Sequence, residues 1–310
     1  MSVATVAPKR RSRRNSRDSR SIYYWYTLPG VIAFVAVVAY PLFRNIQISF
    51  TKWNGYGVAK NVGWRNYAKL MHDSSFWVSF LHAFEFMIAM SIIPTVLGLI
   101  FGALIFDFIS PYFPKSWTTF FRMGLFMPQI VPITVTSVLW TWLLSPNEGV
   151  INNVLKSFGM KNPPDWLGSD HAAILAISAV CIWIQIGYTI TIFITGMGRI
   201  DPSLNEAADL DGANWWQRFR AITVTQLAPE ISIVLLTTTV AAIKIFAPVQ
   251  IMTGGGPGNS TYVPSFYSYF NFFTTQRVGY GAAIATVMVL LLSALSIFLF
   301  KFQNSRTVNM

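Results

Sequence analysis

The chain has 310 residues, of which 53% are hydrophobic and only 11% are charged. A soluble domain carries about 25% charged residues, so this composition excludes a large soluble domain and indicates a protein that crosses a membrane several times. The net charge of +11 is concentrated at one end, because residues 1–20 hold seven lysines and arginines.

The basic segment 1–22 directly precedes an apolar run. This order favours a cytoplasmic tail that contacts anionic lipid over a segment that binds nucleic acid. Residues 21–43 contain no charged side chain, and this run exceeds the apolar core of a secretion signal, which is about 7–15 residues long. We therefore expect a first membrane span at 23–43 that is retained in the mature chain.

Further apolar stretches predict the remaining spans. A helix of about 20 apolar residues crosses the hydrocarbon core of a bilayer, and five more stretches have that length: 86–106, 123–144, 172–197, 227–249 and 278–300. The stretch 227–249 is the weakest, because Glu230 and Lys244 interrupt it. The sequence thus predicts an all-α, polytopic membrane protein whose six transmembrane helices lie within residues 23–303.

The distribution of positive charge predicts the orientation of these spans. An even number of spans places both termini on one side, and the basic tail makes that side cytoplasmic. The segments then assigned to the cytoplasm, including the short end 304–310, hold 14 lysines and arginines, against eight in the outside loops. The first outside loop opposes the rule, because it holds Arg44, Lys52, Lys60, Arg65 and Lys69.

The stretch NEAADLDGANWW, residues 205–216, is unusually polar for this chain. Residues 201–211 predict a short helix, with Asp201 as its cap and Pro202 at its first helical position. Gly212 permits a sharp reversal, and a second short helix with two tryptophans follows. On the predicted topology this hairpin faces the cytoplasm, where it either fits a groove on a soluble partner or lies on the membrane surface.

The spacing of this stretch adds a resemblance. Glu206-Ala207-Ala208, followed by Gly212 and Ile222, resembles the EAA loop of permease subunits in ATP-binding-cassette (ABC) importers. The resemblance implies that residues 198–226 contain a coupling helix that docks into a cleft of a cytoplasmic ATPase. The implied contact residues are Glu206, Ala207, Ala208, Asp209, Asp211 and Gly212. The usual Ile-x-Leu-Pro ending is replaced by Ile-Thr-Val-Thr at 222–225, which leaves the end of the second helix open.

Longer stretches resemble carbohydrate-importer permeases of the maltose and glycerol-3-phosphate kind. These are TKWNGYG, VGWRNYAKLM, FMPQIVPITVTSVLWTWLLSPNEGVIN, and FAPVQIMTGGGPGNST with the later GYGAAIATVMVLLL. The TGGGPG run, residues 253–258, is characteristic of the family's first permease partner. The chain departs from the pattern at His82-Ala83, where Asn-Thr is common, and at 195–198, where Thr-Gly-Met-Gly replaces Ala-Gly-Leu-Gln.

The resemblance also implies partners. It implies a second permease subunit, which the Gly-rich motif suggests is a different chain, two ATPase subunits and an extracytoplasmic solute-binding protein in a bacterial or archaeal cell membrane. ATP and Mg²⁺ would be used by the ATPase. No lysine follows the glycines of 254–258 as in a phosphate-binding loop, so we expect an external turn there. We expect neither a cofactor nor a catalytic residue on this chain.

Aromatic and amide side chains in the later spans suggest a substrate path. Sugar recognition needs aromatic faces that stack on the ring and amides that bond its hydroxyls. The candidates are Gln129, Trp140, Trp183, Gln185, Tyr188 and Lys244. Each side chain has an alternative role in helix packing or interface anchoring, and Lys244 could also pair with an acid of a partner subunit.

Two other classes of protein compete with the importer hypothesis. An ion-coupled secondary transporter is the alternative hypothesis; it would need an ion site of its own and no ATPase. A membrane enzyme is disfavoured, because His72, His82 and His171 are not spaced as a metal pair and no nucleophile-elbow motif occurs.

Overall fold

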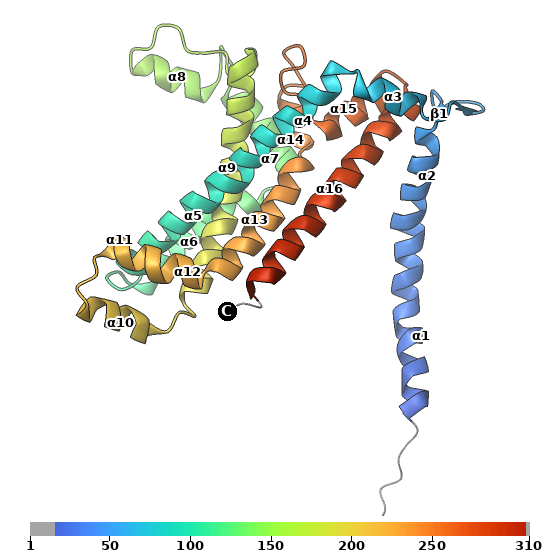
Figure 1. The fold of residues 1–310 in the computed structure, drawn as a ribbon. Coiled ribbons are helices and arrows are strands. Elements are labelled where there is room, and N and C mark those ends of the chain that lie inside the picture. The colour runs from blue at the N-terminus through green and yellow to red at the C-terminus, as the bar shows by residue number, and fades with distance from the viewer. Residues whose placement is uncertain (1–15, 308–310) are drawn as a thin grey trace, which may run out of the picture.

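The computed structural model describes residues 16–307 and shows an almost entirely helical chain (Figure 1). The exceptions are two short strands, β1 (Thr51–Lys52) and β2 (Lys60–Asn61), which pair antiparallel with Thr51 opposite Asn61. Five helices are long and apolar enough to cross a membrane, and a bent helix pair raises the number to six within the described residues. The all-α prediction is therefore confirmed.

The first span stands apart from the other helices (Figure 1). It consists of α1 (Ser16–Phe34), a π-helical turn (Val35–Ala39) and α2 (Tyr40–Ser49), and from Tyr24 onward its apolar side chains are nearly all exposed. Only its far end is tied to α16 (Val278–Thr307), where the Asn45 side-chain amide donates to Ala282 O at 3.2 Å and to Thr286 Oγ1 at 3.0 Å. The apolar surface of α1 thus requires cover by lipid or by another chain.

The second span is longer than the sequence suggested. It runs without a break from α4 (Ser74–Met87) through α5 (Ile93–Leu104), with π-helical turns at Ile88–Ile92 and Ile105–Ile109. The Asp73 carboxylate caps it by accepting the Ser75 N–H at 3.0 Å. At 1.5 Å per residue these 36 residues extend about 54 Å, so the helix is tilted or projects beyond the bilayer.

The third predicted span, 123–144, is wrong as a straight helix. The structure has α6 (Lys115–Ile130) and α7 (Ile133–Leu143), and the chain bends by 96° between them. Pro132 explains the break, because proline donates no N–H and disfavours helical geometry at the preceding residue. Val131 accordingly has extended backbone angles (φ −72°, ψ 128°).

The fourth span, α9 (Asp170–Met197), lies at the centre and packs closely against its neighbours α5 and α6. Thr189 Oγ1 donates to Pro94 O at 2.8 Å. Glycines permit this closeness: a Cβ on Gly98 would lie 2.2 Å from Thr189 Oγ1, and a Cβ on Gly187 would lie 2.1 Å from Leu125 O. Small residues at helix contacts are typical of membrane bundles.

The fifth span is interrupted near Lys244. It consists of α13 (Ala228–Ile243) and α14 (Ala247–Met252), and the Gly-rich turn follows before α15 (Pro264–Tyr269). Gly254 and Gly255 adopt positive φ values of 59° and 86°. A Cβ on Gly255 would lie 2.4 Å from the Phe266 ring. The predicted turn is therefore present, and it returns the chain toward α16.

The remaining short helices give the molecule two distinct ends (Figure 1). At one end lie α3 (Arg65–Met71), α8 (Val150–Ser157), the β1–β2 hairpin and α15. At the opposite end lie α10 (Pro202–Leu210), α11 (Trp215–Arg218) and α12 (Val224–Gln226), together with the start of α1 and the end of α16.

Candidate functional site

Helix α10 carries most of the predicted coupling residues and lies on the surface. Asp201 caps it, because its Oδ1 accepts the Ser203 N–H at 3.0 Å. Hydrogen bonds from the backbone and the side chain of Ser203 hold the pKa of Asp201 below its usual range. No residue of α10 is buried, and Leu210 is 90% exposed. The helix therefore presents nearly its whole surface to solvent or to a partner.

The reversal after α10 is the one that the sequence predicted. Gly212 has φ +73°, which only glycine adopts without strain. A capping box then starts α11: the Asn214 N–H donates to Gln217 Oε1 at 2.8 Å, and the Gln217 N–H donates to Asn214 Oδ1 at 2.9 Å. The helix continues through a π-helical turn (Phe219–Thr223) into α12, so the second helix ends at Gln226.

Residues 215–223, which we call the root of the loop, are fixed to the bundle. The Trp215 indole N–H donates to Asp107 Oδ2 at 2.9 Å, and the Trp215 ring stacks on Phe219 with centroids 5.2 Å apart. Phe219 is only 6% exposed and packs in a cluster with Met197 and Leu227. The root therefore contacts the second, fourth and fifth spans together.

Two ion pairs add to this attachment. Arg218 pairs with Asp209, which links α11 to α10, and Arg199 Nη2 lies 2.6 Å from Glu230 Oε1, which links the loop to α13. Of the predicted coupling residues, Ala208 is half-buried, whereas the other five are exposed: Glu206, Ala207, Asp209, Asp211 and Gly212. The structure thus gathers all six on one projecting hairpin.

The predicted substrate-path residues are only partly gathered. Trp140 and Trp183 meet edge to face with ring centroids 5.5 Å apart. The Tyr188 hydroxyl lies 3.4 Å from Thr237 Oγ1. Gln185 is two positions from Trp183 on α9, which places it about 200° around the helix. Lys244 is exposed where α13 ends, so these side chains do not share one face.

Several buried polar atoms near the bent third span have no hydrogen-bond partner among the described residues. Gln129 Oε1 and Thr136 Oγ1 are buried without a hydrogen-bond partner among the described residues, and Gln250 Oε1 on α14 is in the same state. Burying an unpaired polar atom is costly. The sequence reasoning missed Gln250, although a glutamine inside an apolar run is the signal by which it could have been found.

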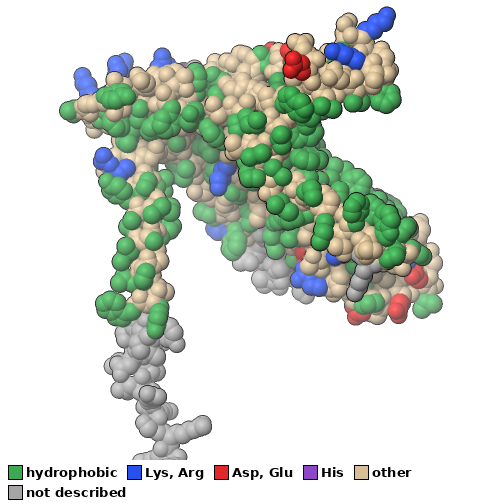
Figure 2. Space-filling model, turned by 180° about the vertical axis from the view of Figure 1, so that it is seen from behind, with side chains coloured by type: hydrophobic (Ala, Val, Ile, Leu, Met, Phe, Trp, Pro, Cys, Tyr) green, Lys and Arg blue, Asp and Glu red, His purple; other side chains and the backbone are tan. Residues whose placement is uncertain are grey.

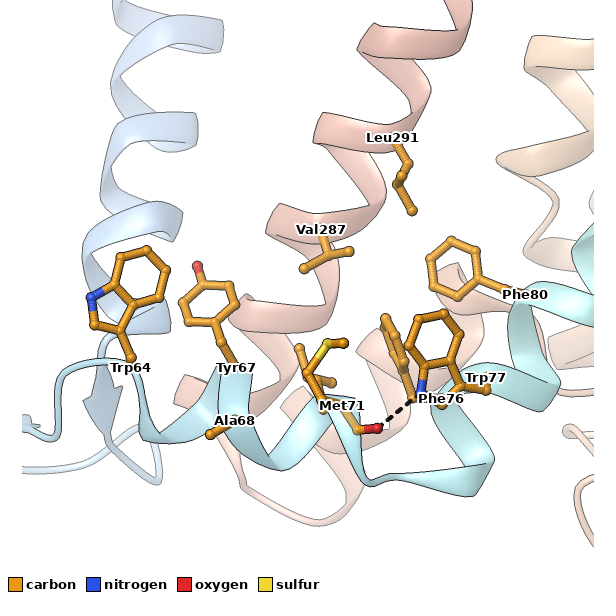
Figure 3. Close-up of a pocket in the computed structure, with 10 residues that line it drawn as sticks. Trp64, Tyr67, Ala68, Met71, Phe76, Trp77, Phe80, Val287 and Leu291 are labelled. Atoms are coloured by element: carbon orange, nitrogen blue, oxygen red, sulfur yellow. Dashed lines mark hydrogen bonds between the residues drawn. The ribbon is translucent and has the colours of Figure 1, made fainter.

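Two hollows lie at the end of the molecule opposite α10. One, of about 480 Å³, has an apolar lining from α3, α4 and α16 (Figure 3). Beside it the Trp77 indole N–H donates to Met71 O at 3.2 Å. The other hollow, of about 840 Å³, is lined by β1, β2, the polar side of α3 and the start of α16. Neither includes a predicted substrate-path residue.

Comparison with known proteins assigns the family. Residues 95–309, more than half of the chain, match the family described as "Binding-protein-dependent transport system inner membrane component". The chain belongs to this family. Members of this family are the membrane subunits of transporters, and in these importers the ATPase is a separate subunit. The family supports the importer hypothesis over the ion-coupled secondary transporter.

Two relatives of this permease cover nearly the whole chain. It is 32% identical to the probable ABC transporter permease protein YurN of Bacillus subtilis, over 92% of this chain and 97% of YurN. It is 30% identical to the lactose transport system permease protein LacF of Rhizobium radiobacter, over 94% of this chain and 98% of LacF. The prediction that this chain is a permease subunit of an ABC importer is therefore confirmed.

The fold of the permease is also found in solved structures. A crystal structure of a bacterial ABC transporter involved in alginate import superposes with a TM-score of 0.80 at 18% identity, covering 93% of this chain and 96% of that chain. A second crystal structure, of a bacterial alginate ABC transporter in complex with its alginate pentasaccharide-bound periplasmic protein, gives a TM-score of 0.77 at 20% identity. It covers 94% of this chain and 96% of that one.

Proposed function

We propose that this permease moves a carbohydrate or related polyol from an extracytoplasmic solute-binding protein into the cytoplasm. The relationship to LacF, a lactose permease, supports a carbohydrate substrate. The observation that carries the transport mechanism is the contrast within residues 198–226: α10 has no buried residue, whereas the root is fixed to three spans.

Helix α10 is the proposed contact with the ATPase. The exposed Leu204, Ala207 and Leu210 are spaced three apart and lie along one side of the helix. Such a small apolar strip, flanked by the acidic Glu206 and Asp211, suits a cleft on a soluble partner. ATP and Mg²⁺ act on that partner, and this chain contributes docking residues only.

The root is the proposed lever. ATP-driven movement of the ATPase would displace α10, and the Trp215–Asp107 hydrogen bond and buried Phe219 would carry the displacement to the spans. Shifting a conformational equilibrium from 1:99 to 99:1 requires about 5.5 kcal/mol of differential binding. A loosely attached helix could not transmit that free energy, which is why the packing of the root matters.

The proposed orientation places α10 and both chain ends in the cytoplasm. The start of α1 and the end of α16 lie on the α10 side of the molecule (Figure 1), which agrees with an even number of crossings. The basic residues 1–15 lie outside the described residues, and their cytoplasmic placement remains a prediction from the positive-inside rule.

The second permease subunit is the proposed cover for the first span. An apolar helix that stands away from its own bundle suits a heterodimer in which it lies against the partner chain. The Gly-rich motif at 253–258 resembles that of the first permease subunit in such a pair. Lipid would cover the remaining apolar surface of α1.

The substrate path would run past the bent third span. The unpartnered Gln129 and Gln250 oxygens offer hydrogen-bond acceptors, and the Trp140–Trp183 pair offers aromatic faces for a sugar ring. Gln185, Tyr188 and Lys244 belong to the predicted path as well. Gln185 and Tyr188 are three positions apart and share one side of α9, whereas Trp183 lies on another side.

Substitution of Gly212 tests the mechanism. Gly212→Pro cannot adopt φ +73°, so the position of α10 changes while the root remains in place. We expect normal membrane insertion and continued ATP hydrolysis, with uptake of radiolabelled sugar lost. The double variant Glu206→Lys with Ala207→Trp should likewise lose uptake while ATP hydrolysis continues.

Gly159→Pro is the matched control, because Gly159 also follows a helix with positive φ (93°) but lies at the opposite end of the molecule. Its uptake should stay near normal. Normal uptake in Gly212→Pro, or equal loss in Gly159→Pro, would contradict the coupling role.

A further inference from the structure

The larger hollow, of about 840 Å³, is basic. Its lining includes five cationic side chains, Lys52, Lys60, Arg65, Lys69 and Arg277, and all five are exposed. Figure 2 shows lysines and arginines along this end of the molecule; acidic side chains are visible both beside the α8 arm and at the end that carries α10. The hollow also has the side-chain amides of Asn54 and Gln276, which can donate hydrogen bonds; the Asn66 amide already donates to Ser49 O and Thr51 O.

Within the described part of the chain, no acid neutralises these cations. No Asp or Glu lines the hollow, and none of its five cations has an ion-pair partner among the described residues. Lys69 instead lies over the Tyr280 ring, with Nζ 4.4 Å from the centroid. An uncompensated cluster of like charge in a concave surface produces a strong local potential that attracts anionic partners.

Asp73, which bonds the Tyr280 side chain that lines the hollow, is already occupied. Its Oδ2 accepts the Tyr267 hydroxyl at 2.6 Å and the Tyr280 hydroxyl, and its Oδ1 accepts the Ser75 N–H. Burial would raise the pKa of Asp73, but these hydrogen bonds, with that from the Phe76 N–H, hold it below the usual range. The carboxylate therefore joins α4 to α15 and α16 and leaves the cations of the hollow unpaired.

Helix α3 separates the basic hollow from the apolar one. Trp64, Tyr67 and Met71 line the apolar hollow together with Val287 and Leu291 of α16 (Figure 3). Arg65, Asn66 and Lys69 line the basic hollow. An interfacial amphipathic helix turns its apolar side to the bilayer and its charged side to water. The basic hollow therefore opens toward the aqueous phase, and this favours a soluble partner over a lipid.

We propose that the basic hollow receives surface carboxylates of the solute-binding protein and thereby docks it on the importer. This inference rests on the proposed function, because it places the hollow outside the cell. It gives a role to four of the five cations of the first outside loop, all but Arg44, which oppose the positive-inside rule. Unpaired cations would speed association by electrostatic steering, and salt would weaken that effect.

Charge reversal tests the docking site. The importer, purified with its ATPase subunits and reconstituted in phosphatidylcholine nanodiscs, is titrated with the solute-binding protein encoded beside it. Lys52→Glu with Arg65→Glu should raise the Kd about tenfold or more, which is about 1.4 kcal/mol, and flatten the dependence of the Kd on salt. Lys69 is left intact because it packs on Tyr280.

The matched control is Lys156→Glu with Lys161→Glu. These two lysines are exposed on and after α8, at the same end of the molecule, but lie outside the hollow. They undergo the same change of charge, and the Kd should change less than about twofold, within the ±0.5 kcal/mol usual for a surface substitution. At saturating binding protein, the reversed variant should regain normal stimulation of ATP hydrolysis, which shows that it is folded.

Three results would overturn the inference. The first is an unchanged Kd in the reversed variant. The second is an equal rise in the control. The third is a loss of binding to phosphatidylglycerol vesicles with no change in the Kd for the binding protein, which would assign the hollow to lipid. Basal ATP hydrolysis separates these results from a failure of the proposed function, because an importer without a copurifying ATPase would contradict that function whatever the Kd.

Discussion

The two halves of the hairpin formed by α10 and the root differ in how they contact the rest of the molecule. Helix α10 buries no side chain, whereas the root at 215–223 places Phe219 in the core and bonds Trp215 to Asp107. The two halves are joined by Gly212 and by the Arg218–Asp209 ion pair. A coupling element of the proposed kind needs this division. The helix that docks on the ATPase must be accessible, and the segment that joins it to the spans must be rigid.

Truncation of one side chain in each half should give the largest contrast. Phe219→Ala removes a buried ring that stacks on Trp215 and Trp216, and we expect a loss of about 3–5 kcal/mol in the free energy of unfolding. Leu210→Ala removes an exposed side chain and should change it by less than about 0.5 kcal/mol. Thermal unfolding of the purified subunit measures both, and equal losses would remove the distinction between the halves.

Removal of the indole donor should have a smaller effect. Trp215→Phe keeps an aromatic ring beside Phe219 but leaves Asp107 without its 2.9 Å hydrogen bond, at a cost of about 0.5–1.5 kcal/mol. A double-mutant cycle with Asp107→Ala, which removes the acceptor oxygen, isolates this contact. An interaction energy near zero would show that the root is held by ring packing alone.

The cap of α10 should give the smallest effect. Asp201→Ala removes the acceptor for the Ser203 N–H, whereas Asp201→Asn retains a side-chain oxygen. We expect faster amide exchange in α10 for Asp201→Ala and nearly normal exchange for Asp201→Asn. Identical exchange in both variants would show that the cap does not order the helix.

Acid should act on the same cap. The pKa of Asp201 is lowered in the folded chain, so the cap contributes fully above the unfolded value of about 3.9. The contribution is lost as the pH falls through the lowered folded pKa. Amide exchange in α10 should therefore stay constant from neutral pH down to about 4 and increase only below it, once intrinsic exchange rates are subtracted.

The sequence predicted the elements whose signals are local. Gly212, the Asp201 cap and the apolar runs each determine structure over a few residues, and the structure reproduces the hairpin and five of the long helices. The bend between α6 and α7 was missed, although Pro132 was visible, because a proline inside a membrane span is often tolerated with only a small kink.

Tertiary contacts account for the rest. The Trp215–Asp107 hydrogen bond joins residues 108 positions apart, and no local pattern encodes it. The substrate path was predicted from residue types alone, so the opposite directions of Trp183 and Gln185 could be found only from the helix itself. Four of the five cations of the basic hollow were visible as an anomaly of charge in the first outside loop, but their convergence with Arg277 depends on the packing of α3 against α16.

Cysteine crosslinking at position 210 tests the central claim most directly. The single native cysteine, Cys181, is buried, so Leu210→Cys with Cys181→Ala gives one exposed thiol, and Phe158→Cys in the same background gives a matched thiol at the opposite end. In the purified importer, a reagent that carries a maleimide and a photoactivated diazirine, attached to the thiol and then irradiated, should join position 210 to the ATPase subunit and leave position 158 unjoined. Labelling of position 210 by an impermeant maleimide added outside intact cells, with no crosslink to an ATPase, would contradict the account.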